Sequence, residues 1–211
     1  MKTVRKLHRI GAVLVGLFVL AHLANHLAAL GGIGAHLRFM EAARLIYRQP
    51  LVELALLLAV VAQAGSGLRL LAAGWRRRTG WLARLQAGSG GYLALFLLIH
   101  VAAVLFGRAV LDLDTNVHFA AAGLQVWPYQ VFFVSYYFLA VLALFTHLGC
   151  ALARRAGPSP GRRLAAVALP ACLGAVLSGI VVAALMGKLY PYAVPQEYEN
   201  TYQAQVAPAQ S

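Results

Sequence analysis

Long apolar runs fill most of this chain, and short polar or basic stretches separate them. A transmembrane helix needs about 20 mostly apolar residues, because the hydrocarbon core of a bilayer is about 30 Å thick. Five runs have this length: 10–30, 51–73, 91–111, 129–153 and 164–187. The pattern therefore predicts an all-α integral membrane bundle of five transmembrane helices.

The segments between the runs are short. In residues 31–50, the apolar residues Leu37, Met40 and Leu45 roughly follow a helical spacing, which predicts a short helix at the membrane surface. Pro50 is expected to begin the second span, since the first residues of a helix do not need their N–H groups.

The other connections are expected to be loops. Residues 74–91 form a basic loop, whose last glycines open the third span, and residues 112–128 form a second loop. We expect residues 1–189 to form the membrane domain and 190–211 a loosely ordered polar tail outside the membrane. No internal repeat is apparent.

Composition and charge agree with a membrane protein. The chain has 211 residues, of which 61% are hydrophobic and 11% charged, whereas about 25% of a soluble domain is charged. Five spans leave no room for a soluble catalytic domain or a nucleotide-binding unit. Thirteen of the 18 Lys and Arg residues lie before the first span, near or in the second connection, or in the fourth connection. This asymmetry predicts a cytoplasmic N-terminus and an external C-terminus. The same asymmetry accounts for the net charge of +12, so this charge does not indicate nucleic-acid binding.

Four histidines interrupt the apolar runs: His22, His26, His100 and His147. Ionisable groups inside membrane spans are rare and usually functional. The first and third spans run in the same direction, and His22 and His100 both lie near their middles, so the two rings can face each other. The fourth span runs the opposite way, which places His147 in a layer nearer the cytoplasm. His36 and His118 are expected in outer loops.

Two neutral imidazoles from facing helices commonly ligate a haem iron. Small residues such as those of "QAGSGL", 63–68, would leave room for the macrocycle. A zinc ion would need a third and a fourth ligand at the same depth, and the sequence offers none. Cys150 and Cys172 have no metal-binding spacing.

The order of these segments resembles the membrane anchor of succinate dehydrogenases and fumarate reductases, specifically the single-chain, five-helix, di-haem cytochrome b type. The matching segments are "RKLHRIGAVLVGLFVLAHL", "YRQPLVELALLLAVVAQAGSGL", "YLALFLLIHV" and "YYFLAVLALFTHLGCAL". The resemblance implies a bacterial cytoplasmic membrane protein that is a non-catalytic electron-transfer subunit. It would anchor flavoprotein and iron–sulfur subunits and pass electrons between them and menaquinone.

The resemblance also implies haem ligands. His22 and His100 would hold an outer haem b, and His147 would be one ligand of an inner haem. Gln63 stands where the family has the second inner histidine. Glutamine is a poor ligand for haem iron, so the sequence predicts the outer haem and leaves the inner one open.

Other site residues are assigned by position. His26 lies one turn from His22 and could hydrogen-bond a quinone or a propionate, or ligate in place of His22. Glu53 fits the family's polar residue near the quinone, but could equally be an interfacial carboxylate paired with Arg48 or Arg44. Arg5 and His8, at the inner edge, could bind propionates or a partner subunit, or be solvated at the headgroups.

Two alternatives remain open. The same histidines would serve the cytochrome b subunit of another respiratory oxidoreductase. A membrane scaffold that has kept the bundle and lost its cofactors would also carry this pattern, and Gln63 slightly favours it.

Overall fold

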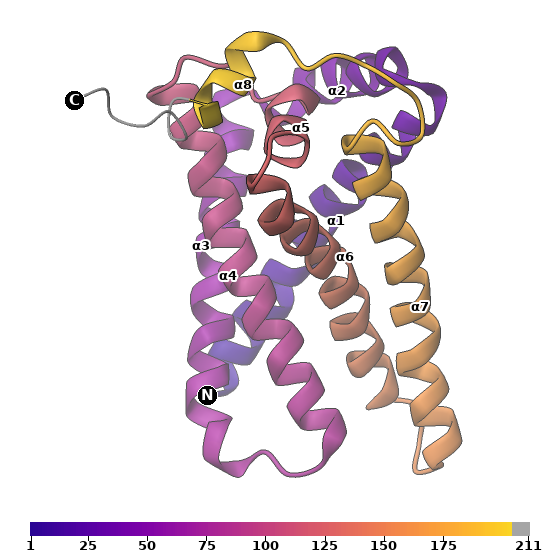
Figure 1. The fold of residues 1–211 in the computed structure, drawn as a ribbon. Coiled ribbons are helices and arrows are strands. Elements are labelled where there is room, and N and C mark those ends of the chain that lie inside the picture. The colour runs from indigo at the N-terminus through magenta and orange to yellow at the C-terminus, as the bar shows by residue number, and fades with distance from the viewer. Residues whose placement is uncertain (204–211) are drawn as a thin grey trace, which may run out of the picture.

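The structure is a computed structural model that describes residues 1–203, and those residues form helices and connecting turns without a strand (Figure 1). Five helical segments are long and apolar enough to cross a membrane. They are α1 (Lys2–Ala28, continued by the 3₁₀ turn η1, Ala29–Gly31), α3 (Pro50–Gly74), α4 (Trp81–Ala109), α6 (Tyr129–Ala153) and α7 (Pro160–Leu185). The predicted all-α membrane bundle is confirmed.

The outward faces of these helices carry large apolar side chains. Leu17, Leu51 and Leu169 are 63%, 82% and 73% exposed. Such faces suit lipid tails, which are as apolar as leucine itself. The bundle therefore has an apolar exterior, and its polar side chains gather inside or at its two ends.

Helix α2 (Ile33–Tyr47) lies where the sequence predicted a short surface helix. Gly32 joins it to η1 with a φ of 91°, a conformation that glycine adopts without strain. Pro50 is the first residue of α3, also as predicted.

The third span begins earlier than predicted. Helix α4 starts at Trp81, so the glycines expected to open it lie inside the helix. The connection to α3 is only residues 75–80 and includes the 3₁₀ turn η2 (Trp75–Arg77). Residues 81–86 are mostly good helix formers and extend the helix beyond the apolar run. Arg78 donates to the carbonyls of Leu70 and Leu71 at 2.9 and 2.7 Å, which satisfies the free carbonyls at the end of α3.

Two short helices were not predicted. Asn116 begins α5 (Val117–Gln125), because its side-chain oxygen accepts the backbone N–H of His118 at 2.8 Å. Helix α8 (Gln196–Gln203) lies in the tail, and its Tyr198 is only 3% exposed. The loose tail expected from residue 190 is therefore wrong as far as Gln203, and residues 204–211 lie outside the described part of the chain.

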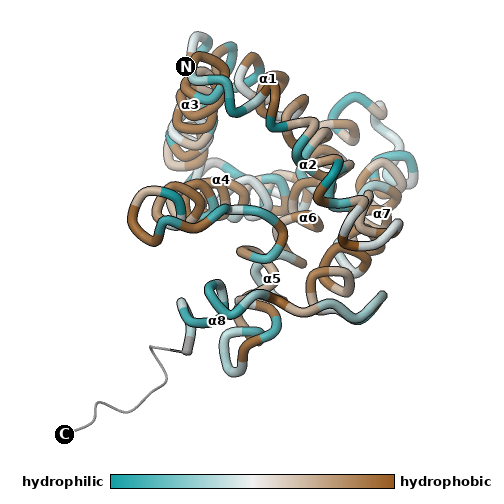
Figure 2. Tube along the Cα trace, turned by 90° about the horizontal axis from the view of Figure 1, so that it is seen from above, coloured by the Kyte–Doolittle hydropathy of each residue, from teal (hydrophilic) through white to brown (hydrophobic). Residues whose placement is uncertain are grey.

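Helices α1, α3, α4, α6 and α7 follow one another around the bundle, and α1 also contacts α7 (Figure 2). Neighbours in contact are α1 with α3, α3 with α4, α4 with α6, and α6 with α7. Helices α6 and α7 pack closely through the buried residues Cys150, Ala153 and Val167. The N-terminus and the α3–α4 turn lie at the lower end in Figure 1, and α2, α5 and α8 cover the upper end.

Candidate cofactor site

A cavity of about 1500 Å³ lies between α1, α3, α4 and α6. Directly packed helices leave few voids larger than a water molecule, and pockets for small ligands are usually about 300–1,000 Å³. Its wall is mostly apolar, and none of the acidic residues in the described part of the chain borders it. The space therefore suits a large, mostly apolar ligand.

The predicted pair of histidines meets across this cavity. His22 on α1 and His100 on α4 have ring centroids 6.0 Å apart, with the ring planes at 65°. Phe18 stacks on His22 and Phe96 stacks on His100, each one turn earlier on the same helix. These stacks restrict both imidazoles to orientations near one another.

The spacing of the two rings fits one metal between them. A bond between a metal and an imidazole nitrogen is about 2.0–2.1 Å, and a nitrogen lies about 1.1 Å from its ring centre, so two axial ligands would have centroids about 6.2–6.4 Å apart. The observed 6.0 Å is close to this value. No group of three His, Cys, Asp or Glu side chains among residues 1–203 is arranged to hold a metal ion. A porphyrin supplies four of its own nitrogens and needs only the axial pair.

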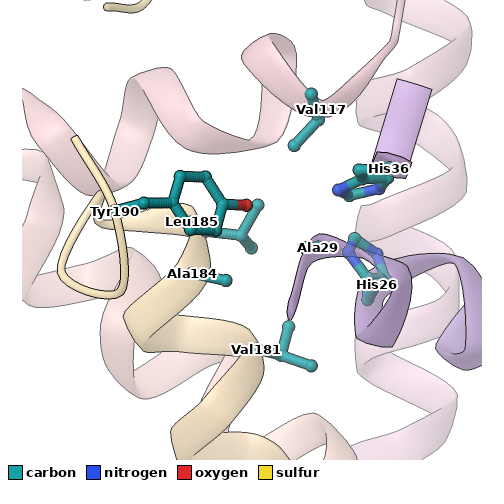
Figure 3. Close-up of a pocket in the computed structure, with 8 residues that line it drawn as sticks. All are labelled: His26, Ala29, His36, Val117, Val181, Ala184, Leu185 and Tyr190. Carbon is teal, nitrogen blue, oxygen red and sulfur yellow. The ribbon is translucent and has the colours of Figure 1, made fainter. Parts of the chain in front are cut away.

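A second contact continues from this pair toward the upper end. His26 Nε2 lies 3.3 Å from His22 Nε2, and the His26 ring is 5.1 Å from that of His36 (Figure 3). His36 lies on α2, in the connection where the sequence placed it, but its side chain is only 2% exposed, and this burial was not predicted. Burial, together with the nearby His22 and His118, lowers the pKa of His36 to about 4.

This upper region contains several polar atoms that are buried without a hydrogen bond in the described chain. They are Asn25 Oδ1, His26 Nδ1 and His36 Nδ1, and all three residues border the cavity. Leaving a buried polar atom unpaired costs about 1–3 kcal/mol. Such atoms are suited to hydrogen-bond a polar group of a ligand.

The lower part of the cavity holds His8 on α1 and His147 on α6. His8 Nδ1 lies 3.1 Å from Ser66 Oγ on α3. His147 Nδ1 lies 3.2 Å from Ser89 Oγ and 3.1 Å from the Gln86 carbonyl on α4. His147 is therefore at a different level from the upper pair, as expected.

Gln63 also borders the lower cavity, but its side chain is directed at α1. A Cβ added to Gly11 would lie 2.7 Å from Gln63 Oε1, and this oxygen is buried without a hydrogen bond in the described chain. Gln63 begins the pentapeptide Gln-Ala-Gly-Ser-Gly, which recurs unchanged at residues 86–90. The expectation that the chain has no internal repeat is therefore wrong at these two positions.

Four guanidinium groups border the cavity with no acid among them: those of Arg5, Arg9, Arg78 and Arg154. Arg154 Nε donates to Gln86 Oε1 at 2.6 Å, and Arg78 makes the two carbonyl hydrogen bonds described above. Arg5 thus lies where the sequence placed it, at the lower end beside His8. This positive mouth suits the carboxylates of a ligand such as a porphyrin.

Glu53 lies elsewhere. Its carboxylate pairs with Arg108 on α4, so the expected partners Arg44 and Arg48 are wrong, and neither member of the pair borders the cavity. Arg44 instead makes two hydrogen bonds to Asp114, at 2.7 and 3.0 Å. Burial alone would raise the pKa of Asp114, but the hydrogen bonds and charge of Arg44 hold it below its usual value.

Searches of protein families, of curated proteins and of solved structures found no match to this chain.

Proposed function

We propose that this chain is a haem b-binding membrane anchor of the succinate dehydrogenase and fumarate reductase type. The observation that carries the proposal is the His22–His100 pair, whose rings lie 6.0 Å apart across a mostly apolar cavity. The resemblance of the ordered sequence segments to that family adds to it. The proposal places the N-terminus in the bacterial cytoplasm, where flavoprotein and iron–sulfur subunits would dock.

Within this proposal, His22 and His100 are the axial ligands of one haem b. The haem would supply one-electron carriage within the membrane. The protein holds the two imidazoles at one level, keeps the surroundings apolar and places cations at the lower mouth. Helix α1 also carries His26, but His22 is the imidazole with a close ring contact to His100. This supports His22 as the ligand and His26 as its polar neighbour.

We further propose that menaquinone binds near the upper end of the cavity. A quinone carbonyl needs a hydrogen-bond donor, and a quinol hydroxyl needs an acceptor. His26 Nδ1, His36 Nδ1 and Asn25 Oδ1 offer such groups in buried positions. Glu53 faces Arg108 outside the cavity wall, so under this proposal it has at most an indirect role in quinone binding.

A reduced-minus-oxidised absorption spectrum of the purified full chain tests the haem. The expected result is a b-type spectrum of low-spin haem, which should be absent or weaker in His22→Ala and His100→Ala. His118→Ala is the matched control, because His118 lies in α5 and does not border the cavity. A wild-type chain that purifies folded and without haem would overturn the proposal and would favour the scaffold alternative.

The same pair of imidazoles would serve the cytochrome b subunit of another respiratory oxidoreductase. Partner subunits distinguish the two. Mild-detergent purification followed by mass spectrometry should recover a flavoprotein and an iron–sulfur protein with this chain. Recovery of a hydrogenase-type partner instead would transfer the haem-binding proposal to that class of complex.

A further inference from the structure

The charged residues of this chain are sorted between the two ends of the bundle. All six acidic residues belong to the upper end, in α2, the first turn of α3, the connection after α4, and α8: Glu41, Glu53, Asp112, Asp114, Glu197 and Glu199. The lower end, with the N-terminus, the α3–α4 turn and the α6–α7 connection, carries thirteen Lys and Arg residues (Figure 1). These cations therefore have no acidic side chain near them, and their counter-ions come from outside the chain.

Four of these cations border the cavity, and we call the part of the cavity that they border the lower mouth: Arg5, Arg9, Arg78 and Arg154. Positive residues at the ends of spans set the orientation in the membrane, but that role does not require a cation to border a space between helices. Lys6 and Arg155, which are direct sequence neighbours of two of the four, do not border it. The lower mouth is therefore a distinct subset of the basic residues.

The protein holds two of the four guanidinium groups in place. Arg154 Nε donates to Gln86 Oε1 at 2.6 Å, and Arg78 is fixed by the carbonyls of Leu70 and Leu71. A guanidinium group has five N–H donors. In the described part of the chain, the Nη atoms of Arg154 have no hydrogen-bond partner. These donors are therefore available to an anion in the lower mouth.

Helix α1 contributes the other two cations. Arg5 and Arg9 lie one turn apart on the same face, and both border the cavity. Like charges at this spacing destabilise a helix. Among residues 1–203, neither side chain has a hydrogen-bond or ion-pair partner. An anion in the lower mouth would relieve this repulsion.

The cations from α1 and α6 lie at about one height. Ser66 and Ser89 are each eight residues from the helix end at the α3–α4 turn, and so about 12 Å above it. Arg5 is one turn before the α1 residue that contacts Ser66. Arg154 contacts Gln86, which is one turn before Ser89. Both guanidinium groups therefore belong to a level just below the two serines.

The space above the lower mouth suits hydrocarbon. The cavity of about 1500 Å³ exceeds the roughly 300–1,000 Å³ that one small ligand usually occupies. Arg9 is thirteen residues before His22, and so about 20 Å lower along α1, which leaves room for a second ligand below the upper histidines. Leu17 on α1 and Leu148 on α6 border the cavity, and they are 63% and 50% exposed. The apolar wall is therefore accessible from the surrounding lipid.

We propose that the lower mouth binds the phosphate of an anionic phospholipid from the adjoining leaflet, with an acyl chain in the apolar space above it. Arginine binds phosphate through two parallel hydrogen bonds, and basic pockets between membrane helices bind anionic lipid headgroups. A free phosphate ion would satisfy the guanidinium groups but would leave the apolar space unfilled. The inference does not depend on the proposed haem.

The test measures phospholipid binding to the purified full chain in detergent by native mass spectrometry. The probes are phosphatidylglycerol and phosphatidylcholine with the same acyl chains, and inorganic phosphate is the competitor. We expect phosphatidylglycerol to be retained, phosphatidylcholine to bind more weakly, and inorganic phosphate not to displace the lipid. Arg9→Gln and Arg154→Gln should each weaken phosphatidylglycerol binding about fivefold, the size expected for one cation at a lipid headgroup.

Two neighbouring residues supply matched controls. Lys6→Gln and Arg155→Gln each remove one charge beside these positions but outside the lower mouth, so they should leave the affinity for phosphatidylglycerol unchanged. Equal weakening by the controls would mean diffuse attraction by net charge and would overturn the site. If Arg154→Gln does not fold, the comparison of Arg9→Gln with Lys6→Gln decides.

Other outcomes would also overturn the inference. Equal retention of the two phospholipids would exclude recognition of an anionic headgroup, and displacement by inorganic phosphate would assign the mouth to a free anion. Loss of haem or of co-purifying subunits in Arg154→Gln, with phosphatidylglycerol binding unchanged, would assign the mouth to those partners. A folded wild type that lacks haem and retains phosphatidylglycerol would overturn the proposed function and support the lipid site.

Discussion

Close packing of α6 on α7 should make Gly149 intolerant of even one added carbon. A Cβ built at Gly149 would lie 3.0 Å from Val167 Cα and 3.0 Å from the Ala166 carbonyl oxygen. These are backbone atoms of α7, so no side-chain rotation relieves the contact. We predict that Gly149→Ala forces the two helices apart and destabilises the bundle.

The size of the effect follows from two opposed terms. An added methyl in a well-packed core costs about 1–3 kcal/mol, whereas replacing glycine by alanine inside a helix gains about 0.5–1 kcal/mol. Gly179 in α7 supplies a matched control, because a Cβ there meets nothing within 4 Å. Gly179→Ala should show the gain alone, so the difference between the two variants should be about 1–3 kcal/mol.

Equilibrium unfolding in mixed detergent micelles, followed by circular dichroism, measures this difference. A shift of about 2–4 °C in midpoint temperature is expected for each kcal/mol in a chain of this size. If Gly149→Ala is as stable as Gly179→Ala, then α6 and α7 do not pack in the way described here.

Three other changes should have measurable results. His36 has a pKa of about 4 in the fold, against 6.5 when unperturbed, so between these two pH values it is neutral in the folded chain and protonated in the unfolded chain. The free energy of unfolding should therefore fall as the pH drops from about 6.5 to 4, by at most about 3 kcal/mol. His36→Asn should flatten that part of a plot of melting temperature against pH. Asp114→Asn should lower the free energy of unfolding at pH 7 by only about 0.5–1 kcal/mol, because the site is partly exposed. The difference from the wild type should vanish at a pH below the lowered pKa of Asp114. Tyr198→Ala should lower the free energy of unfolding by about 3–5 kcal/mol, since this buried ring anchors α8. Tyr198→Phe should lose only the hydrogen bond from Asn116, which is worth about 1 kcal/mol, and the same thermal melts measure both variants.

The membrane spans could be predicted because lipid imposes a simple rule on the sequence. Every backbone polar group in hydrocarbon must be satisfied within its own helix, so a spanning segment has to be long and continuously apolar. The helix ends follow weaker rules. Trp81 begins α4 ten residues before the run predicted as the span, because residues 81–86 are mostly good helix formers and extend the helix beyond that run.

The level of the upper histidines could be predicted as well, since rise per residue fixes height along a helix. Their neighbours could not. His36 was expected in an outer loop, and its burial against His26 by α2, which folds back over the upper end, was not predicted. Helix α8 escaped prediction for the same reason, because its polar sequence buries Tyr198 only against the cap formed by α5. Contacts between distant segments depend on how the helices tilt and turn, which local sequence does not determine.

Gln63 illustrates why a single substituted position is weak evidence about a cavity shared by four helices. A helix-by-helix comparison with the family looks for a histidine in the second span, and this chain has none there. A metal between helices instead requires two lone pairs at one level that face one another, and any wall helix can supply them. In this chain Ser66 on α3 contacts His8 of α1, and Ser89 on α4 contacts His147 of α6. The repeated pentapeptide therefore shows which imidazoles are held against α3 and α4, which the residue at position 63 alone does not reveal.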